Sequence, residues 1–223
     1  MSQIAVIIPA FNECKRIAAA LAALDVNDVV IADGGSRDGT AESAAAAGAK
    51  VIVKHGARGT ALNLAASKCA GDMLLFLHAD TELPADWQDC VRQTLADPSV
   101  ALGAFSLGIA DARPAERLIA RAATIRSRLF GLPYGDQALF LRRRTFEVLG
   151  GFGALPIMED FDLVRRARRL GRIVTLPQRV ETSARRWRTK GVLRTTAINQ
   201  AMLAGWMLGV SPERLAAFYR RVR

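Results

Sequence analysis

The sequence is poor in cysteine, with only Cys14, Cys69 and Cys90 among 223 residues. The three are odd in number and none forms a CxxC pair, so neither a disulfide framework nor a structural zinc site is indicated. We therefore expect reduced thiols in a cytoplasmic protein.

Long apolar runs are also missing. The first one is short, ends at Pro9 and has no basic segment before it, which indicates a buried strand rather than a signal peptide. The longest later run, 197–210, is interrupted by Asn199 and Gln200 and is shorter than the roughly 20 residues that span a bilayer. We expect no transmembrane segment. The sequence also shows no internal repeat and no low-complexity linker.

What is present is enough apolar material for a sizeable core and a charge that is unevenly distributed. Hydrophobic residues make up 51% of the chain and charged residues 23%. Residues 1–112 hold 8 basic and 13 acidic side chains, whereas residues 113–223 hold 23 basic and 8 acidic ones. The basic half indicates an anionic partner, such as phosphate groups, a membrane surface or nucleic acid. The alternative is a solvated basic face with no partner.

The first half alternates strands with helices. Strands are expected at 4–8, 28–32, 50–53 and 72–77, and alanine-rich helices at 13–24, 38–47 and 60–70. Continuous apolar strands in this alternation predict a parallel sheet with right-handed crossovers. After residue 80 the alternation breaks. We expect helices at 84–95, 114–129 and 159–170, strands at 100–109, 137–141 and 172–176, and a helical tail at 192–221 that is interrupted at 209–212.

Polar and glycine-rich segments follow each of the first four strands, at 9–13, 33–40, 55–59 and 78–81. In open α/β sheets, ligands bind beyond the carboxyl ends of the strands, and helix N-termini favour phosphate. The sequence therefore predicts a binding site for a phosphorylated ligand at this edge. It lacks GxGxxG after the first strand and lacks GxxxxGK[ST], which disfavours dinucleotide oxidoreductases and P-loop NTPases.

These segments, with 135–137 and 158–160, resemble family 2 glycosyltransferases of the GT-A fold. The resemblance covers nearly the whole chain and implies one α/β domain with an open, mostly parallel sheet. Its nucleotide-binding half would be 1–112, and its acceptor half with the C-terminal helices 113–223. The segments 75–81 and 183–187 more narrowly resemble a subgroup described as radical-SAM/selenium-associated or arsenosugar-biosynthesis-type transferases.

The resemblance implies a divalent metal, Mn²⁺ or Mg²⁺, that bridges the donor diphosphate. The family usually holds it with a DxD motif after the fourth strand, and here the triplet is His78-Ala79-Asp80. We expect Asp80 to be the metal ligand. His78 either ligates the metal or packs and hydrogen-bonds beneath the site.

The resemblance also implies a nucleoside pocket lined by Pro9, Ala10, Phe11 and Glu13, although Phe11 by itself could be a core residue. The family's second strand usually ends in Asp-Asp-Gly-Ser, and this chain keeps only the first carboxylate, as Asp33. A UDP-sugar donor is favoured and a GDP-sugar stays open. Arg58, Arg185 and Arg186 are expected near the nucleotide, one of the last two reaching the diphosphate.

An acceptor hydroxyl needs a positioned general base. By resemblance to the family's ED motif, Asp160 is the expected base of an inverting transfer, and Glu159 supports it or contacts the acceptor. The alternative is that both complement a helix N-terminus. Gly135, Asp136 and Gln137 are expected to face the acceptor or the donor sugar, and Trp187 to cover the sugar.

Two other functions fit the sequence less well. A sugar-1-phosphate nucleotidyltransferase would carry a glycine-rich basic loop after the first strand, which 9–13 lacks. A non-catalytic nucleotide-sensing or basic surface-binding module would not need both Asp80 and Asp160. The expected partners are a nucleotide-sugar donor and an unidentified hydroxyl acceptor, and no nucleic acid. Peripheral membrane association is open because of the basic half. A homodimer is also open, since the apolar stripe of the tail helix, Ile198, Met202, Leu203 and Trp206, suits core or dimer contact better than a membrane anchor.

Overall fold

The computed structural model describes residues 3–222, except for the side chain of Arg186. Its first half is the expected alternation, and the apolar runs of β1, β2 and β4 are buried, whereas β3 lies at the edge of the sheet and is partly exposed. The strands are β1 (Ile4–Ala10), β2 (Val29–Asp33), β3 (Lys50–Val53) and β4 (Met73–Phe76). The helices between them are α1 (Cys14–Ala22), α2 (Thr40–Ala46) and α3 (Arg58–Ala66). β1 pairs in parallel with both β2 and β4, and β2 with β3.

The second half completes an eight-stranded sheet of order β3-β2-β1-β4-β7-β6-β8-β5. It adds the strands β5 (Thr81–Glu82), β6 (Val100–Ile109), β7 (Leu139–Arg142) and β8 (Arg172–Thr182). β7 runs antiparallel between β4 and β6, whereas β6 and β8 are parallel. β1, β2, β4, β6 and β8 therefore share one direction, and their carboxyl ends lie at the same edge of the sheet.

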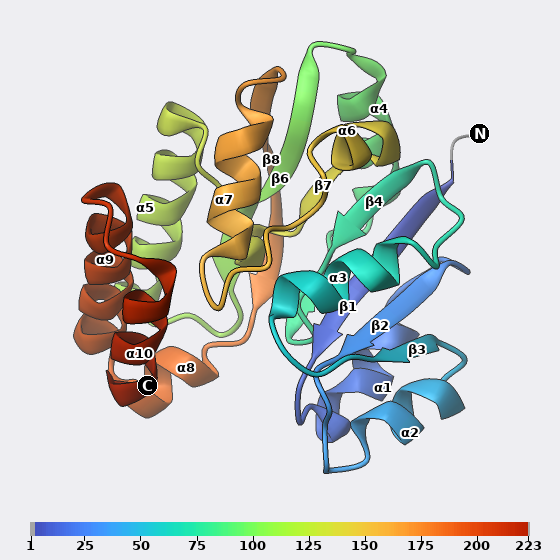
Figure 1. Cartoon of the computed structure of the whole chain (residues 1–223), viewed down its shortest axis with the longest axis horizontal. Coiled ribbons are helices and arrows are strands. Elements are labelled where there is room, and N and C mark those ends of the chain that lie inside the picture. Colours follow the sequence, from blue (N-terminus) through green and yellow to red (C-terminus); the bar gives the residue numbers. More distant parts are fainter. Residues whose placement is uncertain (1–2, 223) are drawn as a thin grey trace.

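The helices of the second half are α4 (Trp87–Ala96), α5 (Pro114–Phe130), α6 (Arg143–Val148) and α7 (Glu159–Ala167), with a 3₁₀ turn, η1, at Gly135–Gln137. Three more helices follow β8, namely α8 (Arg185–Lys190), α9 (Val192–Met207) and α10 (Pro212–Val222). α9 contacts α5, α8 and α10 and lies apart from the strands of the first half (Figure 1), whereas α8 begins at Arg185, which reaches Glu13 after β1. Among residues 3–222, no helix combines the length and the apolar character needed to cross a bilayer.

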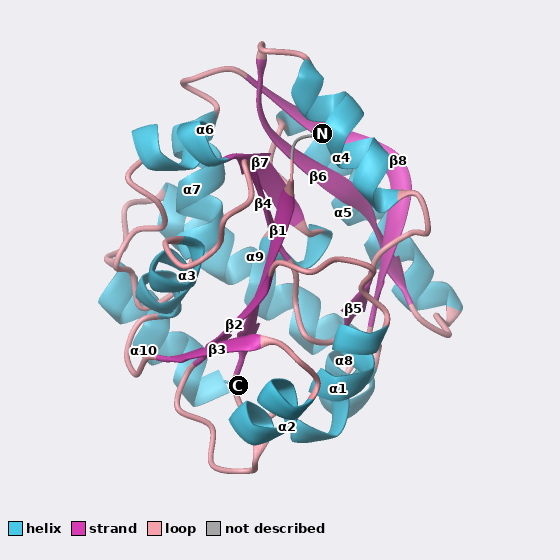
Figure 2. Ribbon diagram, turned by 90° about the vertical axis from the view of Figure 1, so that its right-hand side faces the viewer, coloured by secondary structure: helices cyan, strands magenta, loops and turns pink. Residues whose placement is uncertain are grey.

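Two apolar cores form, one on each face of the twisted sheet (Figure 2). Along β1, Ile4, Val6 and Ile8 point to the face covered by α1, α2, α4 and α5, whereas Ala5 and Ile7 point to the face covered by α3, α6 and α7. This is the alternation of a strand that is buried on both sides.

β8 differs most from its expected bounds. The sequence predicts a strand at 172–176, whereas β8 continues to Thr182. Between the pairs Ala104↔Thr175 and Ser106↔Arg179, β8 contains two more residues than β6. Pro177 lies in this irregularity, where no ladder hydrogen bond is needed from it. The extension carries β8 to the sheet edge that the polar segments occupy.

Candidate active site

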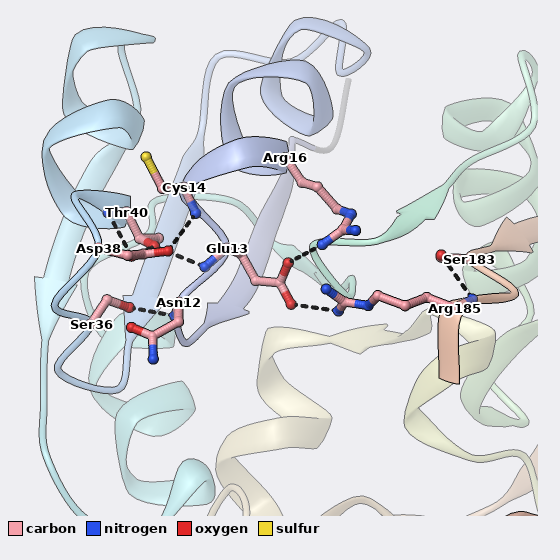
Figure 3. A network of polar contacts seen from close by, with 9 residues as sticks. All are labelled: Asn12, Glu13, Cys14, Arg16, Ser36, Asp38, Thr40, Ser183 and Arg185. Carbon is pink, nitrogen blue, oxygen red and sulfur yellow. Dashed lines mark hydrogen bonds and ion pairs between the residues drawn. The ribbon is translucent and has the colours of Figure 1, made fainter. Parts of the chain in front are cut away.

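Glu13, whose side chain is only 17% exposed, joins the carboxyl ends of β1 and β8. One carboxylate oxygen accepts a hydrogen bond from Arg185 and the other from Arg16, each at 3.0 Å (Figure 3). The Ser183 amide donates to the carbonyl of Asp80 at 3.0 Å, which ties the end of β8 to the loop after β4. The ends of the three strands therefore converge on one acidic and basic cluster.

Asp80 lies in this cluster as a half-buried carboxyl group. Burial raises its pKa, the negative charge of Glu13 raises it further, and Arg185 acts in the opposite direction. A carboxylate whose charged form is disfavoured by burial and by a neighbouring negative charge suits a bound cation.

A divalent cation fits this place only with ligands from outside the protein. Among the described residues, no group of three or more His, Cys, Asp or Glu side chains has the arrangement of a metal site. Mg²⁺ in phosphate-transfer sites is commonly held by one or two carboxylates together with substrate phosphates. Asp80 next to Glu13 matches that incomplete donor set, and the expected diphosphate would complete it.

A second group lies on the other side of the end of β4. Arg58 Nε is 2.5 Å from Glu159 Oε1, and the Glu159 side chain is 8% exposed. Burial raises the pKa of Glu159, against the lowering effect of Arg58. Arg58 Nη1 also lies 3.4 Å from His78 Nε2. His78 therefore belongs to the Arg58 group. Asp80, two residues later in the chain, belongs to the Glu13 cluster.

Asp160 is held beside this pair by the backbone of η1. The Gly135 amide donates to Asp160 Oδ2 at 2.8 Å. A Cβ at position 135 would lie 2.9 Å from that oxygen and 3.2 Å from His78 Nε2, so a larger residue would force the Asp160 carboxylate or His78 to shift. Pro9, Arg58, His78, Gly135 and Asp160 line one narrow pocket, closed by apolar side chains from Leu62, Phe76, Leu139 and Phe152.

Unfavourable backbone conformations concentrate near these groups. Four described non-glycine residues have a positive φ, and three of them, Asn12, Ala138 and Met158, adjoin the predicted site segments. Met158, at φ 65°, directly precedes Glu159 and begins α7. Such conformations cost free energy and are typical of places where function requires a particular geometry.

The loop after β2 is shaped by Asp33. Its buried carboxylate accepts hydrogen bonds from the amides of Gly35 and Ser36 at 2.8 Å and from Ser36 Oγ at 2.6 Å. Ser36 Oγ in turn accepts a hydrogen bond from the Asn12 amide at 2.9 Å, which joins this loop to the end of β1. Asp33, which is 1% exposed, thus fixes the loop that borders the predicted nucleoside pocket.

Phe11 is 63% exposed at the end of β1, next to Gly34, so it is not a core residue. Pro9 and Ala10 end β1 beside it, Pro9 half-buried and Ala10 buried. An exposed aromatic ring at a predicted nucleoside pocket offers a surface on which a base can stack.

Two predicted sugar-side residues point elsewhere. Gln137 is fully buried and donates to the Phe105 carbonyl at 2.9 Å and to Ser127 Oγ at 3.0 Å. Trp187 is 8% exposed and packs into the core on the α5 face. The geometry therefore gives both side chains a structural position rather than a substrate-facing one. Asp136 lies half-buried in η1, and the side chain of Arg186 lies outside the described residues.

The sequence reasoning missed Arg16 and Tyr134. Arg16 shares the Glu13 carboxylate with Arg185, and its spacing of three residues from Glu13, one helical turn, was the available signal. Tyr134 precedes Gly135, lies under the guanidinium of Arg126 at 3.5 Å and meets Phe161 edge-on at 6.1 Å. No local pattern marks Tyr134, because its partners come from α5 and α7.

Comparisons with known proteins show the fold and the family. Several solved structures share the fold at low sequence identity. A mannosyltransferase of Pyrobaculum calidifontis in complex with GDP-Man and Mn²⁺ has a TM-score of 0.68 and 21% identity, over 90% of this chain and 61% of that one. Glucosyl-3-phosphoglycerate synthase of Mycobacterium tuberculosis, in complex with Mn²⁺ and UDP-glucose, has a TM-score of 0.58 and 20% identity, over 80% and 70% of the two chains.

TarS 1–349 of S. aureus with UDP-GlcNAc has a TM-score of 0.60 and 16% identity, over 81% of this chain and 58% of that one. The chain thus spans only 61% of the mannosyltransferase and 58% of the TarS fragment. No curated protein matches the sequence. The fold is that of the GT-A glycosyltransferases, as predicted. The model of the family described as glycosyl transferase family 2 matches residues 5–150, nearly two thirds of the sequence, and the chain belongs to that family.

Proposed function

We propose that the chain transfers a sugar from a nucleotide-diphospho-sugar to a hydroxyl group of an acceptor, with inversion at the anomeric carbon. The observation that carries the proposal is the arrangement at the end of β4. His78 contacts Arg58, which belongs to one group with Glu159 and Asp160. Two residues later in the chain, Asp80 lies in the other cluster, with Glu13 and Arg185. A leaving diphosphate needs groups that stabilise its charge, and an attacking hydroxyl needs a general base, and the two must lie side by side.

The diphosphate is proposed to lie against Asp80. A bound Mn²⁺ or Mg²⁺ would supply Lewis-acid stabilisation of the charge that grows on the leaving diphosphate. Asp80 would hold that ion, and Glu13 supports the site by keeping Arg185 in place. The guanidinium of Arg185, 47% exposed, is available to phosphate oxygens at the same time.

The nucleoside is proposed to lie over the ends of β1 and β2, with Phe11 as its exposed aromatic contact and Asp33 holding the loop beneath it. We propose a UDP-sugar as the donor. The similar structures carry GDP-mannose, UDP-glucose and UDP-GlcNAc, so the fold accommodates either base.

Asp160 is proposed as the general base. Its Oδ2 is oriented by the Gly135 amide, and it lies half-buried in the pocket beside Arg58. Glu159 positions Arg58 rather than meeting the acceptor, because its carboxylate is buried and paired. The base removes the acceptor hydroxyl proton as the oxygen attacks the anomeric carbon and the nucleoside diphosphate departs.

We also propose that the enzyme acts in the cytoplasm, peripherally at a membrane. The excess of basic residues in 113–223 supports this. The nucleotidyltransferase alternative remains disfavoured by the loop at 9–13, and the non-catalytic alternative by the presence of both aspartates. The narrower subgroup resemblance stays a prediction.

A thermal-shift panel tests the proposal. UDP, GDP, ADP and CMP are added with and without Mn²⁺ to the wild type and to Asp80→Asn. A ligand that binds the native state raises its stability, so one diphosphate should raise the melting temperature in a Mn²⁺-dependent way in the wild type only. If no nucleotide shifts the wild type with or without Mn²⁺, the proposal is wrong.

A further inference from the structure

An apolar stripe runs along the outer side of α5. Leu118, Ile125 and Leu129 are 68%, 46% and 72% exposed, and Ala122 lies between them on the same helical face. The spacing 118, 122, 125, 129 follows the helical period. The buried residues of α5, which are Glu116, Ala120 and Ser127, lie on the opposite side. The stripe therefore faces away from the core and no described part of the chain covers it.

A second stripe runs along α9. Leu193 and Leu208, at its two ends, are 86% and 84% exposed. Between them the outer face of α9 consists mainly of small exposed residues, which are Ala197, Ala201 and Ala204. α9 contacts α5, and both lie at the same side of the molecule (Figure 1). The exposed apolar residues of these two neighbouring helices are therefore grouped in stripes rather than scattered singly.

The exposed charged side chains of α5 and α9 all have one sign. Arg117, Arg121 and Arg128 of α5 and Arg194 of α9 are exposed. The one acidic residue of α5, Glu116, is 1% exposed, and α9 has no acidic residue. Two copies of the chain packed face to face would bring these arginines together without compensating carboxylates from either helix. The surface is complementary to an anionic one.

We infer that the outer faces of α5 and α9 form the surface by which this protein lies on an anionic lipid bilayer. The leucines and isoleucine enter the boundary between headgroups and acyl chains, and the arginines contact lipid phosphates. The inference rests on the proposed peripheral membrane association and not on the transferase activity.

The surface is close to the predicted base. Trp206 of α9 meets Phe161 edge-on at 6.2 Å, and Phe161 directly follows Asp160 in α7. A bilayer against α9 would therefore be one helix away from the acceptor side of the site. This position suits an acceptor hydroxyl that is itself presented at a membrane surface.

Vesicle sedimentation tests the inference with two double variants of equal charge change. Leu129→Glu/Leu208→Glu alters the proposed surface, whereas Val148→Glu/Leu170→Glu alters exposed residues of other elements, which are 66% and 50% exposed. Phosphatidylcholine vesicles with and without about 30% phosphatidylglycerol are compared at low and high salt. The wild type and the control pair should bind the anionic vesicles at low salt, and the α5–α9 pair at least about tenfold less, a difference of about 1.4 kcal/mol.

The outcomes separate the claims. No binding of the wild type at low salt would overturn both the membrane association and the surface. Equal binding of the two double variants would overturn the surface alone. If the wild type does not bind vesicles and is dimeric in solution, whereas Leu129→Glu/Leu208→Glu is monomeric, the surface contacts a second copy of the chain instead. Nucleotide-induced thermal shifts in both variants report separately on folding and on the proposed donor site.

Discussion

Replacing Arg58 by Met is the most informative perturbation of the site's structure. It removes the guanidinium whose Nε lies 2.5 Å from Glu159 Oε1 and leaves a carboxylate that is 8% exposed. A buried acceptor that loses its partner costs about 1–3 kcal/mol of unfolding free energy. Because the Arg58 side chain is 39% exposed and water screens the pair, we expect the variant to lose less than a fully buried pair would.

The loss should also depend on pH. Burial raises the pKa of Glu159 and Arg58 lowers it, so Arg58→Met raises the pKa further. A carboxyl group with a higher pKa in the folded state binds more protons there than in the unfolded state. The free energy of unfolding then falls as pH rises from the unfolded pKa to the folded one. The variant should therefore differ least from the wild type at about pH 4 and most at about pH 7.

Urea unfolding at these two pH values measures the effect. The matched control is Arg172→Met, which breaks the exposed pair of Arg172 and Asp97, 3.5 Å apart with side chains 67% and 45% exposed. That variant should lose less than about 1 kcal/mol. Adding Glu159→Gln to Arg58→Met should recover much of the lost stability, since no buried charge remains. Equal losses for Arg58→Met and Arg172→Met at both pH values would refute this account of the pair.

Three further predictions follow from the same geometry. Asp80→Asn should raise the unfolding free energy of the metal-free protein at neutral pH, because burial and the charge of Glu13 disfavour its ionised form; chemical unfolding with and without Mn²⁺ checks this, and a loss of stability would contradict it. Gly135→Ala places a Cβ 2.9 Å from Asp160 Oδ2 and should reduce donor turnover about 100-fold while nucleotide-induced thermal shifts persist; unchanged turnover would count against the role of Asp160. Arg143→Met removes a guanidinium that donates to three main-chain carbonyls after and within α3 and should cost about 1–3 kcal/mol in urea unfolding without changing nucleotide binding.

The parallel half of the fold could be predicted because its signals are local. Each strand is a continuous apolar run, and the bounds of β3 and β6 agree with those expected from the sequence. β8 could not be bounded in this way, since the accommodation of Pro177 depends on pairing with β6, about 70 residues away. β5 has two residues and exists only through its pairing with β8, so no sequence pattern reveals it.

The site was predictable to the extent that strand ends mark it. Glu13 and Asp80 come together because β1 and β4 are parallel neighbours. The alternation predicted the parallel sheet, whereas the order of its strands is known only from the structure. The pairing of Glu13 with Arg185 spans 172 residues and depends on the path of β8. Gln137 was misplaced for a different reason. A polar residue in a turn resembles a ligand, and only the packed structure shows that its amide is satisfied by Phe105 and Ser127.

The central claim is that carboxylates at two neighbouring places on one sheet edge serve a single transfer reaction. The test measures the rate at which nucleoside diphosphate is released from the preferred nucleotide-sugar, with Mn²⁺ present and water as the acceptor. The rate of Asp160→Asn is compared with that of the wild type. The account predicts unchanged nucleotide binding and a release rate lower by about 10²–10⁴-fold, the usual contribution of a general base. Release at the wild-type rate by a variant that binds the nucleotide equally well would contradict it.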